Sequence, residues 1–442
     1  MNDTQIIGKN SSVFRYGQKE CCIIKANMAV WYNFIILTNN QSCESKISEF
    51  TDFFYSKPII NRSINTKKDR YGSLLVSFLN YIFLDREKPL KDIDELTFDI
   101  GNEFLNKYAW GELSKRKYRN GNNVTRSHAT INIAEFTLMN FYKWLFYKKD
   151  QTNNKKKYKL KYIHADDFIY DTKLINNKTI NVLESKFIVE YPQDRSVNKI
   201  ESPSELMVYL LIDIARQFEP MLSLAFALQA FTGIRRGEVC QMTIGRVHFR
   251  KYSGFVDGLY IDLLHELLLR SDGARTGEIK RHRIQVAYPA FLNYIYKLYS
   301  EHIELLRQKG LDYNEYSALF FDDNDNAMTT DTYARKFNNL IPKLMDRLNE
   351  MKNNGNINAS RDYGLLCDAK ITPHSFRDFF SEYVAQQECP AMLAVYRGDL
   401  SLESALTYLR RARSNITEIQ NIQNSFIETY EKIMGKPFSV KL

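Results

Sequence analysis

The sequence predicts a mainly α protein of the α+β kind, with one small antiparallel sheet in an otherwise helical chain. Apolar residues recur every three or four positions over long stretches, for example over residues 71–83, which is the spacing of an amphipathic helix. Residues 247–286 are instead punctuated by glycines and resemble strands. With 442 residues, 44% of them hydrophobic, the chain is long enough for two or three compact units.

Four segments follow from changes in composition. Residues 1–63 mix aromatic and β-branched residues without a clear period, and we expect an N-terminal arm there. Residues 64–150 are expected to form a helical bundle. Residues 151–203 open with a lysine-rich run and are expected to be a basic, solvated connector between domains. Residues 204–442 form a larger domain that contains the strand-like region.

Helices are expected within both domains. In the bundle they cover residues 71–83, 98–110 and 127–147, and in the larger domain residues 205–218, 221–231, 289–308, 331–352, 374–387, 402–412 and 416–434. One of them ends before Gly233, a residue type that readily adopts the left-handed backbone of a helix C-terminus. The last has apolar residues at helical spacing, and it packs either on its own chain or on a neighbouring copy.

The charge balance favours an anionic partner. The chain carries 61 Lys+Arg against 52 Asp+Glu, a formal net charge of +9. Cationic side chains that bind phosphates release condensed counterions, which favours nucleic acids among the polyanions. The six cysteines show neither a CxxC pair nor the spacing of a zinc site, so we expect no metal or other cofactor. Reduced thiols, no signal peptide and no membrane-length apolar stretch together indicate a cytoplasmic protein.

Two short motifs contain residue types that suit a phosphate. Arg235 follows Gly233 at the start of a helix, where its forked guanidinium can meet an oxyanion, and Glu238 lies three residues later and can orient it. His374 and Arg377 are also three residues apart, so they share one helical face and can converge on one anion. Taken alone, each motif is better explained as an ordinary surface pair than as a phosphate site.

The third motif contains Tyr408 after a Gly398-Asp399 turn, close to the carboxyl end, with three arginines behind it: Arg410, Arg411 and Arg413. Tyr408 lies 31 residues after Arg377. The order and the spacing of the three motifs, over roughly residues 205–420, resemble the tyrosine recombinase (phage integrase) family. The helical bundle is similar to the core-binding domain of that family by architecture rather than by particular residues.

The resemblance implies a site-specific DNA recombinase, of the integrase or transposase type, that encloses duplex DNA in a C-shaped clamp of two domains. Arg235 and Arg377 would bind the scissile phosphate, and His374 would hydrogen-bond to it and accept the tyrosine proton. Tyr408 would form a 3′-phosphotyrosine and release a 5′-hydroxyl. The family also implies four copies acting on two DNA sites through a Holliday junction, accessory DNA-bending or directionality factors, and a place on a mobile element.

Two positions depart from the family pattern. Asp399 stands nine residues before Tyr408, where the family usually has His or Trp, and we expect it to cap a helix because an ionised carboxylate cannot donate to a phosphate. Arg275 occupies the slot of the family's general-acid lysine, but a guanidinium is a poor proton donor. Lys280 is the lysine within reach and is our choice for this role, while the other cations of residues 273–286 are expected to contact phosphates.

Other activities share these residues. A type IB topoisomerase or a hairpin-forming resolvase would use a similar set without exchanging strands between two duplexes. A DNA-binding relative that has lost catalysis would account for Asp399.

Overall fold

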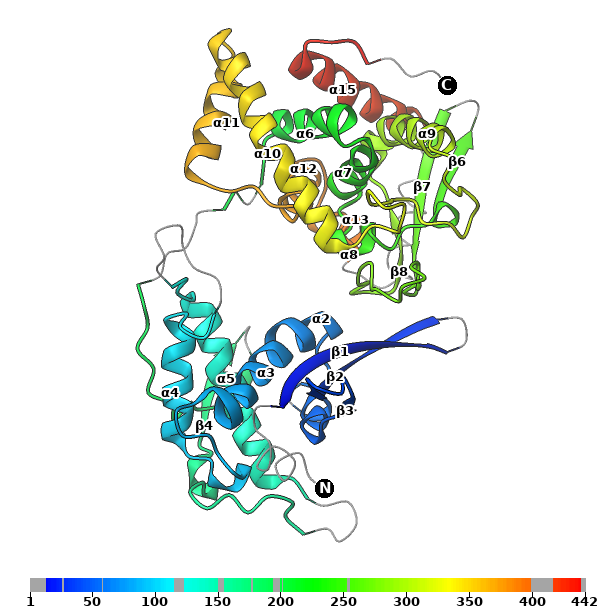
Figure 1. The fold of residues 1–442 in the computed structure, drawn as a ribbon. Helices are drawn as coiled ribbons and strands as arrows, with labels where there is room; N and C mark the ends of the chain where they lie inside the picture. Colours follow the sequence, from blue (N-terminus) through cyan, green and yellow to red (C-terminus); the bar gives the residue numbers. More distant parts are fainter. Residues whose placement is uncertain are drawn as a thin grey trace. The chain divides into compact units, whose positions relative to one another are not determined.

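A computed structural model of the chain describes residues 13–25, 28–57, 59–114, 123–149, 155–175, 178–193, 199–200, 202–252, 255–398 and 416–438. Its contacts divide the chain into two compact units, Met1–Ile23 with Trp31–Ser196 and Ile24–Val30 with Val197–Leu442. We call them the N-terminal unit and the C-terminal unit. Helices predominate among the described residues (Figure 1), so the mainly α class expected from the sequence is confirmed. No helix in these described ranges is both long and apolar enough to cross a membrane.

The N-terminal unit combines helices with two small sheets. Its elements are β1 (Phe14–Lys25), β2 (Met28–Asn39), β3 (Ser45–Ile47), η1 (Glu49–Tyr55), α2 (Ile64–Thr66), η2 (Lys67–Gly72), α3 (Ser73–Asn80), η3 (Tyr81–Asp85), η4 (Ile93–Glu95), α4 (Phe98–Ala109), α5 (His128–Tyr147), η5 (Ala165–Asp167), β4 (Tyr170–Ile175) and β5 (Lys178–Leu183). The first three strands form a sheet in the order β1-β2-β3, and β4 pairs antiparallel with β5. Residues 24–25 of β1 and 28–30 of β2 are counted with the C-terminal unit. Side-chain caps fix the helix starts; Ser127 Oγ, for example, accepts the N–H of Thr130 at the start of α5.

Aromatic side chains fill the core of this unit. Phe53 of η1 meets Phe141 of α5 edge-on with 5.2 Å between ring centroids, and Phe78 of α3 meets Phe104 of α4 at 5.1 Å. Edge-to-face pairs at these distances stabilise a core beyond the area that they bury. Part of the expected arm, residues 1–63, therefore contributes to the same core as the helical bundle.

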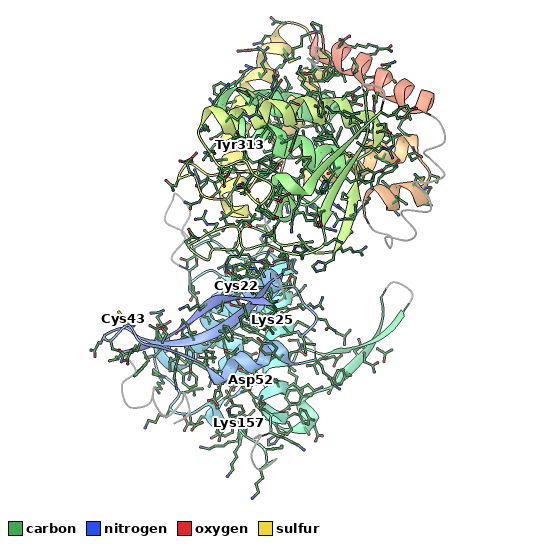
Figure 2. The ribbon with its side chains drawn as sticks, turned by 90° about the vertical axis from the view of Figure 1, so that its right-hand side faces the viewer. Cys22, Lys25, Cys43, Asp52, Lys157 and Tyr313 are labelled. Carbon is green, nitrogen blue, oxygen red and sulfur yellow. The ribbon has the colours of Figure 1, made fainter. Side chains whose placement is uncertain are left out.

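The lysine-rich stretch also lies on this unit. Lys157 (labelled in Figure 2) makes an ion pair with Glu49 at 2.5 Å. Tyr158 and Phe187 are buried in the same hydrophobic core as α3 and α5. These parts of residues 151–203 are thus packed on the N-terminal unit, because aromatic residues interrupt the lysine run and anchor it.

The C-terminal unit is built around one buried helix. Its elements are α6 (Glu205–Phe218), α7 (Pro220–Thr232), α8 (Arg236–Val239), η6 (Ile244–Arg246), β6 (Val247–Tyr252), β7 (Phe255–Leu263), β8 (Arg283–Val286), η7 (Pro289–Phe291), α9 (Leu292–Gln308), α10 (Thr330–Asn353), α11 (Ile357–Asp368), α12 (Ser375–Gln387), α13 (Pro390–Tyr396) and α15 (Ile416–Met434). The strands form an antiparallel sheet in the order β6-β7-β8, in the region where the sequence predicts strands.

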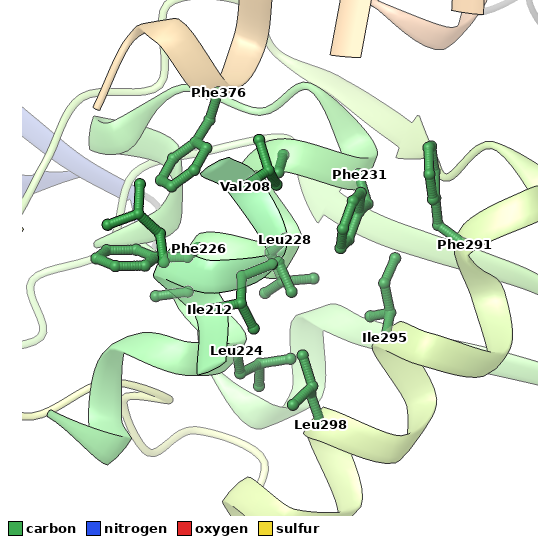
Figure 3. Close-up of a cluster of buried hydrophobic side chains, with 14 of the residues drawn as sticks. Val208, Ile212, Leu224, Phe226, Leu228, Phe231, Phe291, Ile295, Leu298 and Phe376 are labelled. Carbon is green, nitrogen blue, oxygen red and sulfur yellow. The ribbon is translucent and has the colours of Figure 1, made fainter. Parts of the chain in front are cut away.

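Helix α7 positions the site. Its residues from Met221 to Thr232 are all buried. Figure 3 shows part of this core, in which α7 packs with α6, α9 and α12 through Val208, Ile212, Leu224, Phe226, Leu228, Phe231, Ile295, Leu298 and Phe376. A close-packed helix of this kind cannot shift without opening cavities, so the backbone at its end is held firmly. That end is Gly233, in the left-handed conformation expected from the sequence, with φ of 67°.

The C-terminal helix packs on its own chain. Phe426 of α15 lies 5.1 Å from the ring of Phe291, and Tyr430 lies 5.2 Å from that of Tyr209. Both α15 residues are buried, and Gln423 Nε2 donates to the carbonyl of Val256 at 3.0 Å. Of the two arrangements expected from the sequence, this structure has the one in which the helix packs in cis.

Candidate active site

The first arginine lies directly after the buried helix. Arg235 is the N-cap of the short helix α8, and its backbone N–H donates to Glu238 Oε2 at 2.8 Å. Its guanidinium is 3.4 Å from Glu238 Oε1, and 25% of the side chain is exposed. Arg235 is therefore fixed at its backbone by Glu238, while its guanidinium reaches solvent.

Glu238 is completely buried between two arginines. Arg283, at the start of β8, donates one N–H to each carboxylate oxygen at 3.0 Å. Burial alone would raise the pKa of Glu238, but the hydrogen bonds and charge of Arg283, together with the N–H and charge of Arg235, outweigh it and lower the pKa. The carboxylate is thus ionised at neutral pH, and two guanidinium groups share it.

His374 and Arg377 lie at the start of α12, on one helical turn. His374 is exposed, and its carbonyl accepts the N–H of Arg377 at 2.9 Å. Arg377 is almost fully buried. Its guanidinium donates to the carbonyl of Gly233 and, at 3.2 Å, to the carbonyl of Arg397. Arg377 thereby ties the turn before Arg235 to the turn that precedes residue 399.

A second contact fixes α12 to α7. Gln229 of α7 donates from Nε2 to the carbonyl of Pro373 at 2.7 Å, and the hydroxyl of Tyr333 donates to Gln229 Oε1 at 2.7 Å. All three groups are part of the buried interior or its edge. The turn that carries His374 is therefore held by α7, the helix that ends just before Arg235.

The chain approaches the tyrosine motif through a tight contact. Gln285 of β8 donates from Nε2 to the carbonyl of Tyr396. Gly398 has a φ of 67°, and a Cβ at this position would lie 2.1 Å from Arg283 Nε. Only glycine fits this turn, both for its conformation and for the space. Asp399 and Tyr408 lie in residues 399–415, outside the residues that the structure describes.

The two candidates for the general acid differ in their surroundings. Strands β7 and β8 pair antiparallel, and residues 264–282 between them form a long connection rather than a tight hairpin. The side chain of Arg275 in this connection is only 7% exposed and donates to both oxygens of Glu266 at 2.8 Å. Lys280 is exposed. The connection presses against α8, because a Cβ on Gly237 would lie 2.9 Å from the backbone of Glu278.

Comparison with known proteins gives matches among solved structures. No protein-family model matches the chain, and a search of curated proteins finds no match. The XerA recombinase matches at 17% identity over 88% of this chain and 99% of its own, with a TM-score of 0.30. The XerH site-specific recombinase bound to its difH substrate matches at 17% identity over 85% of each chain, with a TM-score of 0.44.

Residues 75–356 of lambda integrase bound to DNA match at 13% identity over 80% of this chain and 95% of that chain, with a TM-score of 0.42. Each of these proteins is named as a recombinase or an integrase. They are thus of the kind that the sequence motifs resemble.

The sequence motifs did not reveal Arg283. We expected the cations of residues 273–286 other than Lys280 to contact phosphates. Arg283 and Arg275 are instead buried in ion pairs with glutamates, so that expectation was wrong for both. The one available signal was the strand pattern of residues 283–286. Alternate side chains of a strand point to the same face, so Arg283 shares a face with Gln285.

Proposed function

We propose that this chain is a tyrosine-type site-specific DNA recombinase. Tyr408 Oη attacks a backbone phosphorus atom, the bond from phosphorus to the 5′-oxygen breaks, and a 3′-phosphotyrosine forms. His374 accepts the phenolic proton, and Lys280 gives a proton to the departing 5′-oxygen. Arg235 and Arg377 stabilise the charge that develops on the non-bridging oxygens. Attack by the 5′-hydroxyl of another strand reverses these steps and joins the DNA without a further energy source.

The hydrogen bonds of Arg377 support this proposal most directly. One guanidinium joins the carbonyl of Gly233, two residues before Arg235, to the carbonyl of Arg397, two residues before Asp399. Three motifs that are far apart in the sequence therefore meet at one side chain. A phosphate site needs such convergence, because donors stabilise a transition state only when they are fixed before the reaction.

The choice of Lys280 as general acid rests on the burial of Arg275. Its guanidinium is held by both oxygens of Glu266, with 7% of the side chain exposed. Moving it to a leaving group would leave Glu266 as an uncompensated charge. Lys280 is exposed on the same connection, and an ammonium group gives up a proton far more readily than a guanidinium.

The partners follow from the same proposal. The substrate is double-stranded DNA, and four copies assemble on two DNA sites. Integration or transposition of a mobile element, with accessory DNA-bending or directionality factors, is the biological setting that we propose. A cytoplasmic, DNA-associated location agrees with the formal net charge of +9.

Covalent capture tests the activity. The purified chain is incubated with a library of nicked duplexes of randomised sequence, in which cleavage beside the nick releases a short fragment and prevents religation. We expect a covalent adduct that survives denaturation and that Tyr408→Phe abolishes. Tyr316→Phe is the matched control, because Tyr316 is 81% exposed on the same unit and outside the proposed site. Binding without any adduct would show a DNA-binding protein and overturn the proposal.

Religation separates the related activities. The captured sequence is placed in two different duplexes, and the products are sized. Joining of one duplex to the other is expected of a recombinase. Relaxation of a supercoiled circle without joining would identify a topoisomerase instead.

A further inference from the structure

Two arginines share one carboxylate at the proposed site. Within the described chain, Glu238 is the carboxylate that forms an ion pair with Arg283 and also the one that forms an ion pair with Arg235. The two pairs are unequal. Arg283 donates to both oxygens at 3.0 Å, whereas the guanidinium of Arg235 approaches one oxygen at 3.4 Å. A bidentate pair in a buried place is the stronger of the two, so Arg283 takes up most of the negative charge.

Exposure divides the roles of the two arginines. The Arg283 side chain is 6% exposed and the Arg235 side chain 25%. All three nitrogens of the Arg283 guanidinium donate within the protein, to Glu238, to Gln285 and to the carbonyl of Arg281, while Arg235 has an open side. The cluster of two guanidinium groups and one carboxylate keeps one positive charge in excess, and this charge is available at Arg235.

The other edge of Arg283 meets the turn before the tyrosine segment. Its Nε donates to Gln285 Oε1 at 2.7 Å, and Gln285 holds the carbonyl of Tyr396. Gly398 packs directly over the same Nε, in a space that admits no Cβ. One buried side chain therefore sets the position of the carboxylate that orients Arg235 and of the turn from which the chain continues to Tyr408.

We infer that Arg283 is a positioning residue, which binds the Glu238 carboxylate and so leaves the Arg235 guanidinium for the scissile phosphate. This inference rests on the proposed function. Without Arg283, Glu238 would pair with Arg235 alone and compete with the phosphate for it. A neutral residue at position 283 should then slow strand cleavage, and removal of the carboxylate as well should restore it.

The test compares single-turnover cleavage with DNA affinity, using the nicked duplex that the wild-type chain captures. For Arg283→Met we expect cleavage to slow about 100-fold, the loss typical of one misplaced transition-state donor, with DNA affinity changed less than about threefold. Adding Glu238→Gln to Arg283→Met should recover at least about tenfold of the rate. Arg283→Lys, which keeps the positive charge, should retain most of the wild-type cleavage rate.

Lys336→Met is the matched control. Lys336 is also a buried cation of this unit, paired with Glu219 at 2.6 Å and Asp323 at 2.5 Å, and it lies outside the proposed site. We expect it to lower the melting temperature without changing the cleavage rate of the folded enzyme. Glu238→Gln should give no recovery in that background. A merely structural role of Arg283 would make the two backgrounds behave alike.

Several outcomes would overturn the inference. Cleavage by Arg283→Met within about twofold of wild type would do so, as would a double variant no faster than the single one. If the single variant does not fold, the double variant decides alone, because removing both charges of a buried pair is often tolerated. For the inference to stand, the double variant must then cleave DNA at a rate within about tenfold of that of the wild type. A wild-type chain that captures no DNA would instead contradict the proposed function.

Discussion

Two glutamates of the C-terminal unit each bind an arginine with both oxygens, yet their surroundings differ. Glu266 is paired with Arg275, on the connection between β7 and β8. Glu238 is paired with Arg283 and is also contacted by Arg235, which reaches solvent. In the first arrangement one carboxylate is paired with one guanidinium. The second leaves one guanidinium charge in excess, and the proposed phosphate site requires this excess rather than a buried ion pair as such.

Removal of the exposed arginine should have the largest effect. Arg235→Ala is expected to slow strand cleavage by about 10²- to 10³-fold, roughly 3–4 kcal/mol of transition-state stabilisation, because a fixed donor to the phosphate is lost. DNA affinity should fall much less, since phosphate contacts elsewhere carry most of the binding. Single-turnover cleavage and equilibrium binding measure the two quantities. Arg377→Ala should behave in the same way; normal cleavage by either variant would remove that residue from the site.

Leaving-group chemistry sharpens the contrast between Lys280 and Arg275. Lys280→Ala should slow cleavage of ordinary DNA about 100-fold or more, the usual contribution of a general acid. A substrate with sulfur in place of the 5′-bridging oxygen needs no proton from the enzyme, and it should restore the rate of this variant. The cleavage rate of Arg275→Ala should not rise with the sulfur-containing substrate. Rescue of Arg275→Ala in place of Lys280→Ala would transfer the role to Arg275.

The balanced pair should matter for stability. Glu266→Ala leaves the Arg275 guanidinium buried without its carboxylate, and we expect it to lower the free energy of unfolding by about 3 kcal/mol. Urea denaturation measures this change. In Glu266→Ala with Arg275→Met, part of the loss should be recovered because the uncompensated charge is gone. Equal stability of both variants would show that the pair contributes packing alone.

Acid should have the smallest effect. The folded state lowers the pKa of Glu238 below its ordinary value of 4.5. The resulting stabilisation is complete above that value and disappears as the pH falls through the lower, folded pKa. The difference in unfolding free energy between wild type and Glu238→Gln should therefore shrink below pH 4.5. A difference that is constant from pH 7 to pH 3 would contradict the lowered pKa.

Regular patterns could be predicted from the sequence. The long helices α5, α6 and α10 were expected within a few residues of their ends, because apolar periodicity and capping residues act locally. The hairpin of β4 and β5 was missed, since residues 170–183 lie in a polar stretch without clear alternation. Helices α11, of 12 residues, and α13, of 7 residues, were missed as well, because helix boundaries depend on neighbouring elements.

The candidate site was predicted in part, for a physical reason. Motifs brought Arg235, His374 and Arg377 forward, and the structure brings their turns together. Whether each guanidinium is buried or exposed could not be predicted from the sequence, because this depends on partners that are distant in the chain. Arg283 and Glu238 are 45 residues apart. The placement of Asp399 and Tyr408 stays a prediction, as both lie outside the described residues.

The packing of α15 limits how far Tyr408 can lie from the C-terminal unit. Phe426 and Tyr430 dock this helix in the aromatic core beneath α7, and Gly398 is fixed on the other side of the tyrosine segment. Tyr408 is eight residues from Ile416, so a fully stretched chain spans about 29 Å at most between them. Both ends of this tether belong to one folded unit. In the proposed reaction the phenol would therefore stay within this span of the unit that carries Arg235 and Arg377, which would give it a high local concentration at a phosphate bound there.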